Sequence, residues 1–177
     1  MTFSAIFSQT LAVLALFGNA IILLLLACLF LFKNNGSGQK IINFFGKRAL
    51  PFSLLIAAGA TLGSLVYSEV LNFPPCPLCW YQRVFMYPLV VILIVASVRK
   101  ENVGHYAIPL ASIGGLFSLY HYSLEWGLIP SAFCGAEALS CAQRLVFEFG
   151  FVSLPWMTLT TFLLIILFFV AKKHVRE

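Results

Sequence analysis

The fold of this chain is decided by one stretch, Phe73-Pro74-Pro75-Cys76-Pro77-Leu78-Cys79-Trp80-Tyr81-Gln82-Arg83, where a proline-rich connection becomes a long apolar segment. Pro77 has a fixed φ and no N–H, which suits the first turn of a helix. If the helix begins there, the sulfurs of Cys76 and Cys79 lie near its N-terminus, where free N–H groups and the helix dipole favour a thiolate. Arg83 follows Cys79 by four residues, so the two share a helix face. This pattern predicts a redox-active site.

Composition places the chain among membrane proteins. Of its 177 residues, 61% are hydrophobic and only 10% are charged, and the mean hydropathy is +0.97. A soluble domain would not cover so much apolar surface with so few charges. The formal net charge of +5 gathers at the ends of apolar segments. We therefore interpret it as membrane topology and see no nucleic-acid footprint.

Apolar runs long enough to cross a bilayer, which takes roughly 20 residues, occur at 5–32, 49–71, 80–98, 104–124 and 152–171. The first has no basic residues before it and is too long for a signal peptide, so we expect it to be retained. The expected fold is an all-α integral membrane protein with five spans. A flexible stretch at 34–38 sets off an N-terminal transmembrane helix with its basic loop, 1–48, from a four-helix transmembrane bundle, 49–177.

The basic residues also predict the orientation. They fill the first loop, the third loop and the C-terminal tail, at Lys33, Lys40, Lys47, Arg48, Arg99, Lys100, Lys172, Lys173 and Arg176. Placing these segments in the cytoplasm puts the N-terminus outside, the C-terminus inside, and the loops 72–79 and 125–151 outside. In the second outer loop, apolar residues recur at helical spacing from 137 to 149. That spacing predicts a short amphipathic helix on the membrane surface.

Four of the five cysteines fall in the outer loops, Cys76 and Cys79 in the first, Cys134 and Cys141 in the second. Disulfides persist on the oxidising side of a membrane. Cys28 lies within the first span, and we interpret it as a small buried apolar residue.

Several interpretations of the four outer cysteines stay open. They form redox-active pairs, or two inert structural disulfides in a non-catalytic membrane subunit or transporter, or a four-thiolate zinc site. The oxidising compartment and the lack of a second Cys-x-x-Cys disfavour zinc, so we expect no metal. Covalent haem attachment is excluded because tryptophan, not histidine, follows Cys79.

Three polar residues near the outer membrane surface are further candidates. Arg83 would anchor to lipid phosphate, or it would partner a thiolate or a reduced quinone oxygen. His121 and Glu125 lie four residues apart and share a helix face. His121, the deeper of the two, is a candidate to line a cofactor pocket, whereas Glu125 is interpreted as a polar cap at the interface.

Taken together, short motifs over residues 50–171 resemble the disulfide bond formation protein B (DsbB) family, above all its short BdbC-type branch. In chain order they are Leu62-Gly63-Ser64, Tyr67-Ser68-Glu69, Cys76-x-x-Cys79-Trp80-Tyr81-Gln82-Arg83, Met86-Tyr87-Pro88, His121-Tyr122, Cys134 with Cys141, Gly150-Phe151 and Leu154-Pro155. The segment 1–48 departs from the four-span pattern of that family.

The resemblance implies a DsbB-like thiol oxidase, a protein-disulfide oxidoreductase of the bacterial cytoplasmic (inner) membrane. Such enzymes reoxidise a DsbA- or BdbD-like thioredoxin-fold thiol oxidase outside the cytoplasm. They pass the electrons to a membrane quinone, ubiquinone or menaquinone, and a quinone-linked pair of this kind keeps the bacterial periplasm oxidising. The expected partners are therefore that thiol oxidase, the quinone and membrane lipid.

By the same resemblance, the outer cysteines form a relay. The partner's thiolate attacks a Cys134–Cys141 disulfide, at Cys134. The released Cys141 then attacks Cys76 of a Cys76–Cys79 disulfide, which frees Cys79 to face the quinone. Each step is a thiolate–disulfide exchange.

The resemblance also assigns the quinone site. Arg83 and His121 match family positions associated with it, and Gln82 is a candidate to hydrogen-bond the quinone ring. A related quinone-linked enzyme that runs toward substrate reduction has the same cysteine pattern and is an open alternative.

Overall fold

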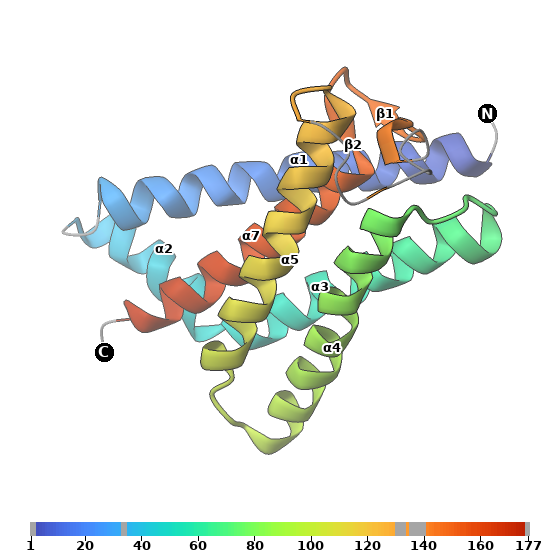
Figure 1. Ribbon diagram of the computed structural model, residues 1–177. Helices are drawn as coiled ribbons and strands as arrows, with labels where there is room; N and C mark the ends of the chain where they lie inside the picture. The colour runs from blue at the N-terminus through green and yellow to red at the C-terminus, as the bar shows by residue number, and fades with distance from the viewer. Residues whose placement is uncertain (1–2, 33–34, 130–133, 135–140, 176–177) are drawn as a thin grey trace.

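The computed structural model describes residues 3–32, 35–129, 134 and 141–175. Within these residues the chain forms six α-helices and one two-stranded antiparallel sheet, and α3 continues into a single π-helical turn, η1 (Figure 1). In chain order the elements are α1 (Phe3–Phe30), α2 (Gly36–Lys47), α3 (Ala49–Leu65), η1 (Val66–Val70), α4 (Pro77–Arg99), α5 (Gly104–Glu125), β1 (Phe147–Glu148), β2 (Val152–Ser153) and α7 (Leu154–Lys173).

Helix α7 lies at the centre of the bundle and packs against α1, α2, α3 and α5. Half of its apolar stretch is buried, against 22% to 28% in the other candidate spans. The phenylalanines Phe162, Phe168 and Phe169 of α7 are almost fully buried in the main core. Helix α1 comes close to α7 at Gly18, where a Cβ atom would lie 2.9 Å from Cγ2 of Thr160. The N-terminal span is therefore packed onto the same bundle as the rest of the chain.

Four of the five expected spans correspond to helices long and apolar enough to cross a membrane: α1, α3 with η1, α4 and α7. The chain is thus a multi-pass membrane protein, with four candidate spans among its described residues. The expected span 104–124 corresponds to α5, which has 22 residues but is less apolar because histidine, tyrosine, serine and glycine interrupt it. A fifth crossing by α5 stays a prediction, as does the division of the chain at residue 48.

The first loop is more ordered than the sequence indicates. We expected a flexible stretch at 34–38, but α2 begins within it, at Gly36. Gly38 permits the tight turn, because a Cβ atom there would overlap Phe32. The inner face of α2 buries Ile42 together with Cys28 and the end of α7. The interpretation of Cys28 as a buried apolar residue is confirmed.

The basic segments gather at one end of the bundle. The Gln39 side chain donates to the His174 carbonyl over 3.0 Å, and Lys172 Nζ donates to Asn102 Oδ1 over 3.3 Å. In Figure 1 the C-terminus and the α1–α2 turn lie to the left, and the η1–α4 connection and the β1–β2 sheet lie above and to the right. The two cysteine-bearing connections therefore share the opposite end. Which end faces the cytoplasm stays a prediction.

The helix expected at 137–149 ends earlier than predicted: residues 141 and 142 are helical, and the prediction is wrong from residue 143 onward. Residues 143–146 are not helical, and β1 pairs antiparallel with β2, with Glu148 opposite Val152. The turn between the strands places Phe149 and Gly150 at φ values of 53° and 78°, a left-handed conformation that ends any helix. The segment 137–140 lies outside the described residues.

Candidate functional site

The first cysteine pair sits at the start of α4, where the sequence predicted it. Pro77 is the first helical residue and Cys76 is the N-cap, whose Sγ accepts a hydrogen bond from the backbone N–H of Cys79 over 3.2 Å. The two sulfurs are unbonded and lie 2.7 Å apart. A disulfide needs a separation near 2.05 Å, so only a small shift separates this dithiol from its oxidised form.

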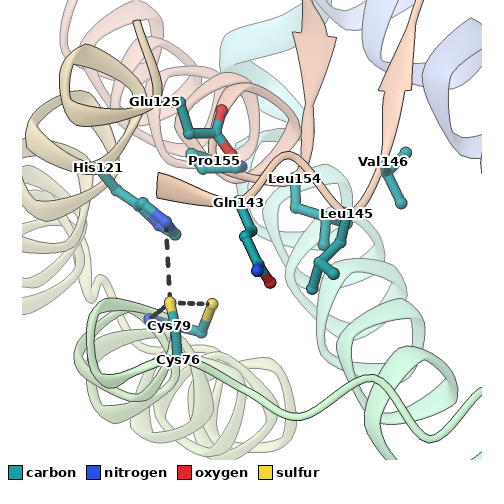
Figure 2. A pocket seen from close by; sticks show the side chains of 9 residues that line it. All are labelled: Cys76, Cys79, His121, Glu125, Gln143, Leu145, Val146, Leu154 and Pro155. Carbon is teal, nitrogen blue, oxygen red and sulfur yellow. Dashed lines mark hydrogen bonds between the residues drawn. The ribbon is translucent and has the colours of Figure 1, made fainter. Parts of the chain in front are cut away.

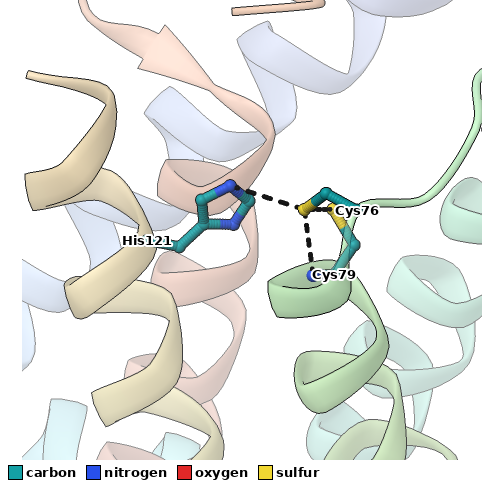
Figure 3. A group of neighbouring side chains, drawn as sticks. All are labelled: Cys76, Cys79 and His121. Atoms are coloured by element: carbon teal, nitrogen blue, oxygen red, sulfur yellow. Dashed lines mark hydrogen bonds between the residues drawn. The ribbon is translucent and has the colours of Figure 1, made fainter. Parts of the chain in front are cut away.

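His121, from α5, contacts Cys76 of the first cysteine pair (Figure 3) and the backbone of the second pair. Its Nε2 lies 3.7 Å from Cys76 Sγ and 3.2 Å from the Cys141 carbonyl oxygen. A carbonyl oxygen only accepts hydrogen bonds, so Nε2 carries the proton. On the other side of the ring, Nδ1 lies 3.2 Å from Nε2 of Gln82 and accepts from that amide. Both ring nitrogens are thereby fixed in one tautomer.

These contacts make Cys76 an acidic thiol. The side-chain hydrogen bond with the Cys79 thiol is the largest cause, and with the contact to His121 it outweighs burial and lowers the pKa of Cys76 to about 4. The thiolate therefore persists at neutral pH, because it exists above this pKa and is lost only as pH falls through it. We expected the helix start to favour a thiolate here, but for Cys76 the larger part of the stabilisation comes from the Cys79 thiol and from His121. The expected role of Arg83, as the partner of a thiolate at Cys79, stays a prediction.

The second cysteine pair is bonded and packed against the first. Cys134 and Cys141 form a disulfide, and both are buried in one cluster with Cys76, Leu78 and Leu124. A four-thiolate zinc site is incompatible with this bond. The ligand atoms of Cys76, Cys79 and His121 do lie within 4.8 Å of one another, a spacing that a metal ion would also accept.

Arg83 is buried, 8% exposed, one helical turn below Cys79. Its Nε donates to Ser64 Oγ and its Nη2 to the Ser64 carbonyl, each over 2.9 Å, which fixes the guanidinium against α3. The guanidinium also lies 5.3 Å from the centre of the Trp80 ring. These two bonds use part of the five-donor fork. Among the described residues these are the bonds that hold the guanidinium, and its other N–H groups could serve another acceptor near Cys79.

A small pocket opens beside the sulfurs, with room for a water molecule (Figure 2). Its lining comes from α4, α5, α7 and the segment after the disulfide: Cys76, Cys79, His121, Glu125, Gln143, Leu145, Val146, Leu154 and Pro155. Glu125, interpreted from the sequence as an interfacial cap, is instead buried in this lining, at 9% exposure. The sequence feature that could have indicated this position is the four-residue spacing between Glu125 and His121, which places both on one face of α5.

The segment after Cys141 is fastened to the end of α5 by Arg144. Its Nε and Nη2 donate to the Glu125 backbone carbonyl over 3.2 and 2.8 Å, and the guanidinium packs on the rings of Trp126 and Phe147. A cation at the C-terminal carbonyls of a helix is stabilised by the helix dipole. This clamp, which sequence reasoning missed, holds the second pair over the first.

Comparison with known proteins agrees with this geometry. Residues 46–172 match the family model described as "Disulfide bond formation protein DsbB". The chain is 40% identical to "Disulfide bond formation protein C" of Bacillus subtilis over 121 residues, which are 66% of this chain and 86% of the relative. It is 44% identical to "Probable disulfide formation protein C 1" of Bacillus cereus over 108 residues, 60% and 78% of the two chains. It is 40% identical to "Probable disulfide formation protein" of Coxiella burnetii over 125 residues, 69% and 85%. No solved structure matches.

Proposed function

Since the chain belongs to the DsbB family of disulfide bond formation proteins, we propose that it is a membrane thiol:quinone oxidoreductase. In this proposal it reoxidises a thioredoxin-fold thiol oxidase outside the cytoplasm and delivers the electrons to a membrane quinone. The observation that carries the proposal is the packing of two cysteine pairs in one buried cluster. Two purely structural disulfides would have no need to contact each other, whereas two cysteine pairs that exchange disulfides must come into contact.

The exchange runs through Cys141 and Cys76. Cys141 is fully buried and its carbonyl oxygen binds His121, so it is the member of the outer pair on the side of Cys76. Cys134 is left to receive the partner's thiolate. Attack of the Cys141 sulfur on Cys76 breaks the Cys76–Cys79 bond and leaves the electron pair on Cys79.

The residues around Cys79 fit a quinone, whose ring accepts two electrons and two protons when bound. Quinone oxygens are hydrogen-bond acceptors, and Arg83 has donors left over beside its two bonds to Ser64. Trp80, which is 54% exposed, and the buried Arg83 lie together at the start of α4. The pocket in Figure 2 is too small for the ring, so we place the quinone on the Arg83 side of Cys79. His121 and Gln82 bind each other, and in this proposal they act on Cys76 rather than on the ring.

The orientation is part of the proposal. The basic segments at the end of the bundle far from the cysteines favour a cytoplasmic position for that end. The N-terminus and both cysteine pairs would then lie outside, where a thioredoxin-fold partner is oxidised.

Quinone reduction by the purified full-length protein, with a reduced thioredoxin-fold oxidase as donor, tests the proposal. Cys79→Ser is expected to abolish it and Cys28→Ser to leave it intact, because Cys28 is buried far from the site among the ends of α2 and α7. Equal loss in both variants would refute the assignment. Thiol trapping with and without quinone tests the rival view of structural disulfides, since inert pairs would keep one redox state throughout.

A further inference from the structure

Glu125 is a buried acid with an unused oxygen at the redox pocket. It is the last residue of α5 and is 9% exposed. Within the described residues its Oε2 has no hydrogen-bond partner. Figure 2 shows the carboxyl group among the side chains that line the pocket with Cys76 and His121. A buried carboxylate with an unpaired oxygen is costly, so the charge on Glu125 depends on its neighbours.

The groups that face Glu125 come from four elements. His121 lies one turn earlier on α5, Cys76 caps α4, Arg144 lies on the segment after the disulfide, and Ser153 comes from β2. From α7 the pocket receives only apolar side chains. Burial disfavours a carboxylate at Glu125 most strongly, Arg144 favours it, and a thiolate at Cys76 repels it. Cys76 is the group among these whose charge changes with its redox state.

The reduced Cys76–Cys79 pair carries one proton fewer than the proposed acceptor, a quinone, takes up. Reduction of a quinone takes up two electrons and two protons. At neutral pH the reduced pair carries one proton, on Cys79, because Cys76 is a thiolate. The second proton must come from another group, and Glu125 is the acid nearest the sulfurs in the pocket lining.

We propose that Glu125 is a redox-linked proton store, which takes up a proton when the Cys76–Cys79 bond is reduced and returns it when the bond re-forms. This inference rests on the proposed function. On reduction, the Cys141 sulfur bonds to Cys76 and its proton passes to the Glu125 carboxylate through the pocket, while the bond between Cys76 and Cys79 breaks and Cys79 takes the electron pair. Cys134 then attacks Cys141, which re-forms the Cys134–Cys141 bond, releases Cys76 as a thiolate and passes the Cys134 proton to Cys79.

When the Cys76–Cys79 pair is reoxidised, Glu125 gives up the proton that it took up on reduction. The Cys76 thiolate and the Cys79 thiol form one S–S bond and release two electrons and the Cys79 proton. Glu125 releases the second proton and becomes a carboxylate again. One negative charge is present before the step, on Cys76, and one after it, on Glu125, so charge is conserved within the pocket.

The test is the pH dependence of the Cys76–Cys79 equilibrium in quinone-free, full-length protein between roughly pH 6 and 8, where thiolates of low pKa and exposed carboxylates are ionised. The redox state is read by alkylation mapping against a dithiol reference of known pH dependence. With two protons per dithiol, the reduction constant falls hundredfold per pH unit, about 59 mV; with one proton it falls tenfold, about 30 mV. We expect two protons in the wild type and one in Glu125→Gln. Glu69→Gln, which alters an exposed carboxyl group, is the matched control and should keep two.

One proton in the wild type, or two in Glu125→Gln, would overturn the proposal. A redox difference infrared spectrum gives a second readout: the band of a protonated carboxyl group should appear on reduction and be absent in Glu125→Gln. If Glu125→Gln fails to fold, the wild-type proton count and infrared band still decide. Because no quinone takes part, failure here leaves the proposed quinone activity standing, and loss of that activity leaves the proton count standing.

Discussion

The acidity of Cys76 is the most quantitative consequence of the site. We predict that the thiolate of reduced protein titrates with a midpoint near pH 4. A thiol with a pKa of about 4 is about 99% ionised at pH 6, against about 0.3% for an ordinary thiol with a pKa of about 8.5. Because the side-chain hydrogen bond of the Cys79 thiol is the largest cause, Cys79→Ala should raise the midpoint more than His121→Ala does.

The size of the effect decides the assay. At pH 6 the shift raises the thiolate population about three-hundredfold, but nucleophilicity falls with pKa, with a Brønsted coefficient of about 0.4–0.5, which lowers the intrinsic rate about a hundredfold. An alkylation rate would therefore change only about threefold. Ultraviolet absorbance of the thiolate follows the population itself and is the better measurement.

Cys76→Ser provides the baseline for this titration, since it removes the thiolate and leaves the other free thiols in place. A midpoint near that of an ordinary thiol would refute the reasoning. So would a larger upward shift in His121→Ala than in Cys79→Ala, because it would reverse the order of the two causes.

Three further predictions test other parts of the structure. Gly114→Ala should lower the free energy of unfolding by about 1–3 kcal/mol in a detergent melt, because the new Cβ would overlap the buried ring of Phe162. Gly115→Ala, where the Cβ would lie 3.6 Å from Phe162, should melt like the wild type, and equal melting of both variants would contradict the packing. Arg144→Gln removes two charged hydrogen bonds to the C-terminal carbonyl of α5. It should slow disulfide exchange between the two cysteine pairs about fivefold in a rapid-quench alkylation assay. An unchanged rate would show that Arg144 does not position the segment after Cys141. Arg83→Ala should raise the apparent KM for quinone while leaving that exchange unchanged, and an unaltered KM in steady-state assays would favour a lipid anchor.

Features with a local cause could be predicted from the sequence. The start of α4 at Pro77 depends on the ring of one proline and a cysteine cap, and both are visible within a few residues. The apolar runs are also local features, and four of them correspond to helices that are long and apolar enough to cross a membrane.

Features that depend on distant partners could not be predicted from the pattern. His121 meets Cys76 across 45 positions of sequence, and Glu125 is buried because the segment after Cys141 covers it. In the second outer loop the apolar residues fit a helix, but the left-handed backbone at Phe149 and Gly150 turns the chain into a hairpin. There the tertiary contacts of Arg144 with α5 outweigh local periodicity.

The central claim is that the outer pair hands its disulfide to the inner pair through Cys141 and Cys76. The most direct measurement is disulfide mapping of the full-length variant carrying Cys79→Ser and Cys134→Ser after mild oxidation. The account predicts a bond between Cys76 and Cys141 in nearly every molecule, with Cys28 free. If Cys76 and Cys141 remained separate thiols, the two pairs would not communicate and the account would be contradicted.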